Sequence, residues 1–202
     1  MADQLLTGTT LVESTSRSDG DIPVGGIIEF NDTYTNLLDG FVFCNGEAIT
    51  DAKSSYNGTT APDYNTQYLS IPGTSFKGKY PDTNDIHYAE NEDGAVETDG
   101  AGILLVAPLI MPNGITVTKV AVYGNTTSES WYLQRTPIVT YAGPINMASA
   151  VIGTEDETIT SGLIDNSAYV YSFFTEALDA NDEIYGARIT YTPRQKFIMR
   201  IR

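Results

Sequence analysis

Short apolar and aromatic segments recur along this chain, and residues that favour turns bound each of them. Residues 41–44 are apolar and are followed at once by Asn45-Gly46, the pair that most favours a tight hairpin turn. Residues 115–123 alternate apolar and polar side chains directly after a turn sequence at 112–114. A period of two places alternate side chains on opposite faces of a strand. The chain is therefore predicted to consist of strands joined by turns.

The same pattern continues toward the C-terminus, and long helical periodicity is absent from the sequence. Thirteen Tyr and eighteen Gly favour strands and turns. Residues 51–56 are the one short helical candidate. Further strands are expected at 103–106, 169–174, 184–191 and 197–201. Strands at such spacing predict a mainly β fold, with an antiparallel, jelly-roll-like β-sandwich in the C-terminal part.

Changes in composition predict four segments. Residues 1–21 are rich in Thr, Ser and Asp and are interpreted as an N-terminal arm. Residues 22–81 form a compact module, and the polar, acidic stretch 82–100 is interpreted as a linker or long loop. Residues 101–202 are predicted to form the β-sandwich domain.

Charge and hydropathy argue against several classes of partner and against a signal peptide. With 26 acidic and 11 basic residues the net charge is −15, which disfavours a nucleic acid. The longest apolar run, residues 103–110, is far shorter than the roughly 18 residues that suggest a membrane span. The start of the sequence, residues 1–4, carries no basic n-region and no apolar h-region, so no signal peptide is predicted.

The last fifteen residues carry the opposite charge. They contain five basic residues and no acidic residue: Arg188, Arg194, Lys196, Arg200 and Arg202. Four of them, from Arg194 onward, are candidates for an interface with an acidic surface of a neighbouring subunit or partner protein. The alternative is a solvated basic end strand.

Residues 22–80 carry a pattern of Pro, Gly, aromatic and Cys positions that resembles the phage tail-collar domain. The motif positions in this sequence are Pro23, Gly25, Gly40, Phe41, Cys44, Asn45 and Gly46. The C-terminal half resembles, through residues 112–120, 164–171 and 182–191, β-sandwich domains of phage and environmental virus structural proteins. Secreted carbohydrate-binding modules share that second pattern.

These resemblances imply a structural component of a tailed-phage virion, of the tail-fibre, collar or head-decoration type. Such a protein would assemble as a homo-oligomer, with a trimer favoured, alongside other virion proteins. It would be made in the host cytoplasm and act in the virion. The alternative is a host-attachment head that binds a receptor or a surface glycan.

Catalysis is not expected, because a single His limits acid/base chemistry and no nucleophile elbow, P-loop or zinc motif is present. His87 lies in the acidic loop and is interpreted as solvated, with a metal or acid/base role as the alternative. Cys44 is predicted to be a buried structural thiol. No cofactor is expected, and a depolymerase-like enzyme is the weakest hypothesis.

Two further kinds of candidate site remain, for calcium and for a sugar. Hard oxygen ligands in one turn make a weak calcium candidate, with a solvated acidic loop as the alternative: Asp179, Asn181, Asp182 and Glu183. A second acidic group, at residues 90–93, is a similar candidate. Trp131 and Tyr132, with Tyr141, are candidates for stacking on a sugar ring, and core packing is the alternative.

Overall fold

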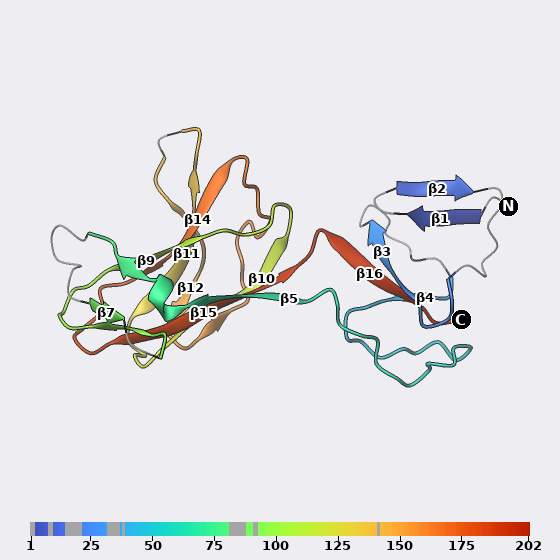
Figure 1. The fold of residues 1–202 in the computed structure, drawn as a ribbon, viewed down its shortest axis with the longest axis horizontal. Coiled ribbons are helices and arrows are strands. Elements are labelled where there is room, and N and C mark those ends of the chain that lie inside the picture. Colours follow the sequence, from blue (N-terminus) through green and yellow to red (C-terminus); the bar gives the residue numbers. More distant parts are fainter. Residues whose placement is uncertain are drawn as a thin grey trace. The chain divides into compact units, whose positions relative to one another are not determined.

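The computed structural model describes residues 3–7, 10–14, 22–31, 37, 39–80, 88–90, 93–140 and 142–202. Strands make up nearly all of its regular structure, so the predicted mainly β fold with antiparallel sheets is confirmed. Contacts divide the chain into two compact units (Figure 1). The smaller unit combines residues 1–67 with 192–202, and the larger unit is residues 68–191. The larger unit is thus inserted into the sequence of the smaller one.

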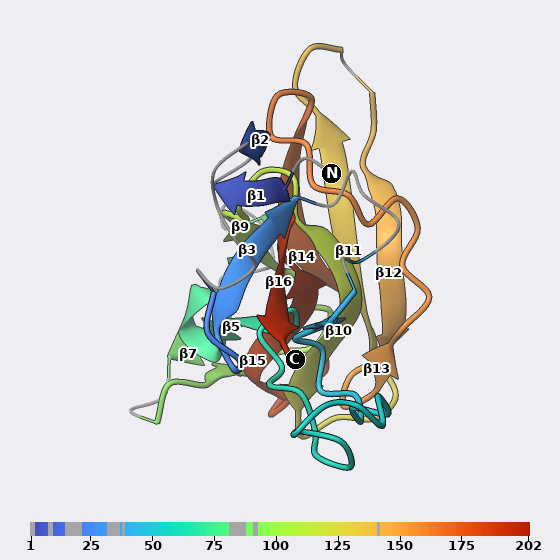
Figure 2. The ribbon, with the colours of Figure 1, turned by 90° about the vertical axis from the view of Figure 1, so that its right-hand side faces the viewer.

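A three-stranded antiparallel sheet organises the smaller unit. Its order is β3 (Ile27–Asn31), β16 (Gln195–Arg200) and β4 (Phe41–Phe43). Ile198 of the central strand lies opposite Ile28 on one side and Phe43 on the other. Figure 2 shows β3 and β16 side by side. The predicted arm 1–21 contains an antiparallel hairpin of β1 (Asp3–Thr7) and β2 (Thr10–Ser14).

The last strand also completes the core of the smaller unit. Met199 and Ile201 are buried beside Cys44, Ile49 and Ala61. The hydroxyl of Ser54 donates to the carbonyl of Ile201 at 2.6 Å. Residues 51–58 form successive turns, so the predicted helix at 51–56 is absent. Backbone bonds such as Ser54 N to Asp51 O, at 2.9 Å, satisfy polar groups there.

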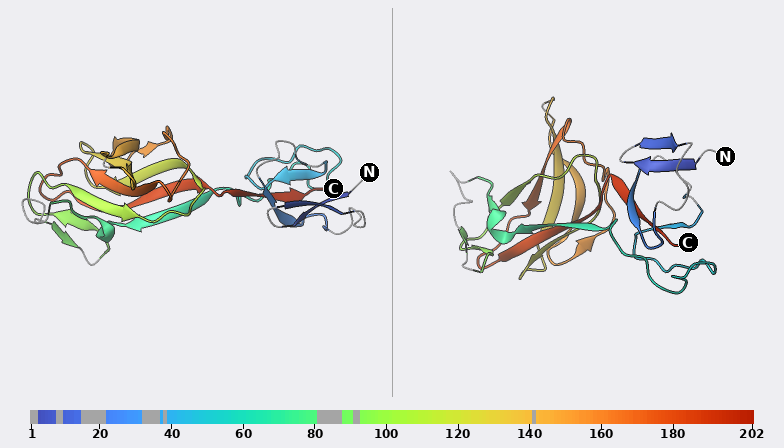
Figure 3. Two further views of the ribbon diagram at one scale, coloured as in Figure 1. Left: turned by 90° about the horizontal axis from the view of Figure 1, so that it is seen from above. Right: turned by 45° about the vertical axis from the view of Figure 1, so that its right-hand side comes forward.

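The larger unit is a sandwich of two sheets (Figure 3). Among the described residues the first sheet has six strands, in the order β13-β10-β15-β8-β7, with β5 also paired to β15. Their bounds are β5 (Gln67–Pro72), β7 (Tyr88–Glu90), β8 (Val96–Thr98), β10 (Thr116–Gly124), β13 (Glu155–Asp156) and β15 (Glu183–Thr192).

The second sheet has five strands in the order β12-β11-β14-β9-β6, and every pairing is antiparallel. Their bounds are β6 (Lys77–Gly78), β9 (Leu105–Leu109), β11 (Ser130–Pro137), β12 (Ile145–Val151) and β14 (Tyr169–Thr175). A short 3₁₀ turn, η2 (Gly73–Ser75), links β5 to β6.

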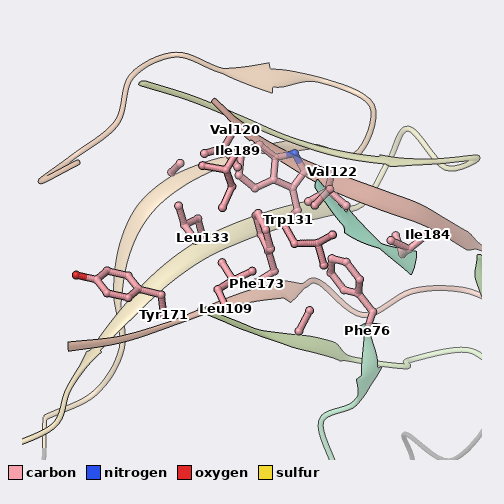
Figure 4. Close-up of a cluster of buried hydrophobic side chains, with 14 of the residues drawn as sticks. Phe76, Leu109, Val120, Val122, Trp131, Leu133, Tyr171, Phe173, Ile184 and Ile189 are labelled. Atoms are coloured by element: carbon pink, nitrogen blue, oxygen red, sulfur yellow. The ribbon is translucent and has the colours of Figure 1, made fainter. Parts of the chain in front are cut away.

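An aromatic cluster fills the space between these sheets (Figure 4). The ring of Trp131 meets Phe173 edge-on with centroids 6.2 Å apart, and Phe76 stacks on Phe173 at 6.0 Å. All three side chains are fully buried. The indole N–H of Trp131 donates to the carbonyl of Thr154 at 3.2 Å, which satisfies its polar group.

These contacts place the unit boundaries differently from the sequence prediction. Part of the predicted linker 82–100 is sandwich, because β8 pairs with β15 and Val96 and Thr98 are fully buried. The hydroxyl of Thr98 donates to the carbonyls of Asp179 and Asp182. At the other end, residues 192–202 leave the predicted sandwich domain, because the apolar face of β16 completes the small core instead.

Candidate functional site

Of the residues predicted to stack on a sugar, Trp131 does not reach the surface. Trp131 has no exposed surface, so the prediction of a glycan contact there is wrong. Tyr132 lies half-buried on the opposite face of β11, and its hydroxyl is 3.1 Å from an oxygen of Glu176. Tyr141 lies outside the described residues. Alternation along β11 explains the difference, because Trp131 and Leu133 face the core and Tyr132 does not.

The calcium candidates form a structural turn between β14 and β15. The carboxylate of Asp182 accepts from the backbone N–H of Asp179 at 2.7 Å, and burial raises its pKa above the ordinary value. Asn181 adopts φ 69° and donates its N–H to Thr98 O. The N–H of Glu183 donates to the side-chain oxygen of Asn125. Within the described ranges, no group of three or more His, Cys, Asp or Glu is arranged for a metal. His87 and the side chains of the acidic stretch 90–92 lie outside those ranges.

Two of the basic residues predicted as an interface bind the chain's own N-terminal segments. Arg200 donates from Nη1 to the carbonyl of Ile22 at 2.6 Å. Arg202 forms ion pairs with Asp39 and, from Nε at 3.1 Å, with Asp51. These contacts lock the last strand into the smaller unit. Arg194 is exposed, and the side chain of Lys196 is not among those described.

The residues of the collar-like motif build the turns and the core of the smaller unit. Cys44 is fully buried, and burial raises the pKa of its thiol, as suits a structural residue. Gly40 has φ 85°, and a Cβ there would lie 3.0 Å from the side chain of Arg202. Asn45 bridges to Asp63 across the turn at Gly46. The carbonyl of Pro23 accepts from Gly26 at 2.7 Å, while Gly25 and Phe41 hold the adjoining turn and strand.

A cluster of tyrosines lies on the outer face of the six-stranded sheet. Tyr68 on β5 and Tyr185 on β15 are 62% and 51% exposed, and Tyr123 on β10 is half-buried. Their neighbours Leu69 and Ile184 face the core. We call the group formed by Tyr68, Tyr123 and Arg188 the tyrosine platform.

Arg188 contacts both Tyr68 and Tyr123 of the platform. Its guanidinium carbon is 5.9 Å from the ring centroid of Tyr68 and 5.6 Å from that of Tyr123. Its Nη2 is 3.4 Å from a carboxylate oxygen of Glu155. Guanidinium–aromatic contacts at such distances are favourable and orient the group. The tyrosine rings therefore flank a fixed hydrogen-bonding group at the sheet surface.

The charges around the platform balance. Lys119 pairs with Glu157 at 2.6 Å and with Glu155 at 3.7 Å, and the hydrogen bond that Lys119 donates to Glu157 is the main cause that raises the pKa of Lys119. The two cations, Lys119 and Arg188, are matched by the two carboxylates. The charges of these four side chains therefore cancel, on a protein whose net charge is −15.

The platform was not predicted from the sequence. It depends on which side chains of β15 face outward and on the pairing of β5 with β15, and neither is a local property of the sequence. In β15 the alternation breaks at Gly186 and Ala187, which are both buried, and this break turns Arg188 outward. A Cβ on Gly186 would lie 2.6 Å from the carbonyl oxygen of Ile71, so only glycine lets β5 approach this closely. The five residues 184–188, Ile-Tyr-Gly-Ala-Arg, carry the one local signal of this shift.

No protein-family model and no curated protein matches the chain. Among solved structures, it is similar to the C-terminal CBM6 of LamC, a marine laminarinase from Zobellia galactanivorans. That likeness has 16% identity and a TM-score of 0.36, over 61% of this chain and 99% of that one. A family two carbohydrate esterase from Cellvibrio japonicus shows 9% identity and a TM-score of 0.31, over 65% of this chain and 34% of that one. Eiger TNF from S. frugiperda gives 14% identity and a TM-score of 0.18, over 65% and 82% of the two chains.

In the part of the chain that the structure describes, no helix is long and apolar enough to cross a membrane.

Proposed function

We propose that the larger unit is a non-catalytic binding module that recognises an uncharged glycan on the tyrosine platform. The observation that carries this proposal is the placement of Arg188 between the rings of Tyr68 and Tyr123 on a solvent-facing sheet. Flat aromatic rings stack on the apolar face of a sugar, and the exposed ring of Tyr68 offers such a surface.

Hydrogen bonding to the sugar would come from the groups that the rings flank. The guanidinium of Arg188 and the carboxylate of Glu155 present donors and acceptors side by side, as neighbouring sugar hydroxyls require. The local charge is balanced while the whole chain is strongly acidic. A polyanionic glycan would therefore be repelled, and a neutral one is favoured.

The experiment is titration calorimetry against neutral oligosaccharides selected on a glycan array. Tyr68→Ala is expected to weaken binding about tenfold, because it removes a stacking surface. Arg188→Lys is expected to weaken it as well, since an ammonium cannot reproduce the planar fork. Tyr80→Ala is the matched control, because Tyr80 is 50% exposed and belongs to neither the platform nor its sheet. Unchanged affinity in Tyr68→Ala, or the absence of any glycan ligand, would contradict the proposal.

A second candidate role is assembly into a tailed-phage virion as a homo-oligomer, with a trimer favoured. It is supported by the collar-like motif, whose glycines and Cys44 build the turns and core of the smaller unit. The two roles are compatible, because the smaller unit would attach and the inserted sandwich would be displayed for host attachment. Native mass spectrometry tests the assembly. A monomer at high concentration, together with absence from purified particles, would exclude this role.

A further inference from the structure

Arg135 on β11 is a cation whose side chain has no ion-pair or hydrogen-bond partner among the described residues. It lies opposite Tyr171 on β14 and Ile145 on β12. Its guanidinium carbon is 4.5 Å from the ring centroid of Tyr169. Its Nε is buried and has no hydrogen-bond partner, and it is the one such side-chain atom within the described residues.

The surroundings of Arg135 leave its charge uncompensated. No ion pair or hydrogen bond within the described ranges involves its side chain, although the chain carries 26 acidic residues. A half-buried charge of this kind normally has a partner, because removing it from water costs free energy. Its terminal nitrogens are not among the buried unpartnered atoms, so they are open to solvent.

The carboxylate of Asp165, whose backbone N–H contacts Tyr171, already has hydrogen-bond partners. Asp165 accepts from the N–H and the hydroxyl of Ser167 at 3.0 and 2.6 Å, and these bonds lower its pKa below the ordinary value. The backbone N–H of Asp165 donates to the hydroxyl of Tyr171 at 2.8 Å. In Figure 4 this hydroxyl points away from Trp131 and Phe76. Arg135 lies opposite Tyr171 in the pairing of β11 with β14.

We propose that Arg135, packed against the ring of Tyr169, is a binding site for the carboxylate group of a small ligand. A guanidinium fork matches the two oxygens of a carboxylate, and both terminal nitrogens can donate to it at once. The ring of Tyr169 holds the guanidinium in place, so little side-chain entropy is lost on binding. The site belongs to the five-stranded sheet and is independent of the tyrosine platform, which belongs to the other sheet.

The experiment follows arginine Nε–H signals by nitrogen-15 NMR while D-glucuronate is added to the full chain. The Arg135 signal, assigned by its loss in Arg135→Lys, is expected to shift saturably with a Kd of about 1–10 mM. Glucose should leave it unchanged. Glucose 6-sulfate and inorganic sulfate distinguish a carboxylate from other oxyanions. Equal saturation by inorganic sulfate would overturn the carboxylate assignment, and no shift with glucuronate would overturn the site.

Backbone amide signals of Tyr169 and Tyr171 provide a second readout. They should respond to glucuronate in the wild type and in Arg188→Lys, and the response should weaken at least about tenfold in Arg135→Met. Arg135→Met keeps an apolar stem against Tyr169, and it is expected to be at least as stable as the wild type because it removes an unpaired buried group. An unchanged response in a folded Arg135→Met would overturn the proposal.

Discussion

Trp131 and Tyr132 are sequence neighbours with opposite environments. The indole is fully buried between the sheets, whereas the phenol lies on the outer face with its hydroxyl against Glu176. Truncating a large buried aromatic side chain removes transfer free energy and leaves a cavity.

We therefore expect Trp131→Ala to lower the free energy of unfolding of the larger unit by about 3–5 kcal/mol. Denaturant unfolding followed by circular dichroism measures this change, and Tyr132→Ala is the matched control with a much smaller effect. A Trp131→Ala variant of wild-type stability that fails to bind glycan would instead favour a direct sugar contact.

This pair also shows what residue patterns can predict. The alternation of residues 115–123 and 169–174 correctly predicted strands, because a period of two is a local property of the backbone. The sequence of residues 131–134 does not indicate which side chains face the core, since Trp and Tyr are both compatible with either face of a strand. The tyrosine platform was beyond prediction because Tyr68 and Arg188 meet only through the pairing of β5 with β15.

At the scale of elements, side chains secure the junction between β14 and β11. Glu176, just after β14, accepts from the backbone N–H of Ser130 at 2.9 Å, and this bond is the main cause that lowers its pKa from the ordinary 4.5. A carboxyl group whose pKa is lowered on folding stabilises the fold above its unfolded pKa. That contribution is lost as the pH falls through the lower, folded value.

The stability of the larger unit should therefore decline as the pH falls below about 4.5, and less steeply in Glu176→Gln. Urea unfolding at a series of pH values, monitored by the fluorescence of Trp131, measures both slopes. Glu97→Gln is a control in the other sheet. Parallel pH profiles for wild type and Glu176→Gln would refute the assigned role.

Individual turns and strands are easier to predict from the sequence than the pairing between strands. Residues 195–200 form the predicted end strand. Asn45-Gly46 ends β4 in a bend, but the predicted tight hairpin is wrong, because β4 pairs with β16 and not with the segment that follows it. The sequence does not reveal that the end strand pairs with β3 and β4, because pairing across the whole chain leaves no local signal. The apolar face of β16 suited a sandwich core and the small core equally well.

At the scale of the whole molecule, the two units have hydrophobic cores of very different size. The larger core contains the aromatic cluster, whereas the smaller depends on a few buried side chains, two of which come from residues 199–201.

Deleting residues 193–202 should unfold the smaller unit and leave the larger one folded. The expected signature is loss of amide protection in residues 39–67 with unchanged fluorescence of Trp131, measured by hydrogen exchange and emission spectra. Concurrent loss of both signals would show that the units fold as one.

The insertion of the sandwich into the smaller unit has a mechanical consequence. The chain passes from the smaller unit into the larger one at residues 67–68 and returns to the smaller unit at residues 191–192. A pull on a ligand held by the sandwich would be carried by two covalent strands in parallel, each under about half of the tension. A protein that grips a surface while its other part is anchored would thereby resist detachment without any disulfide.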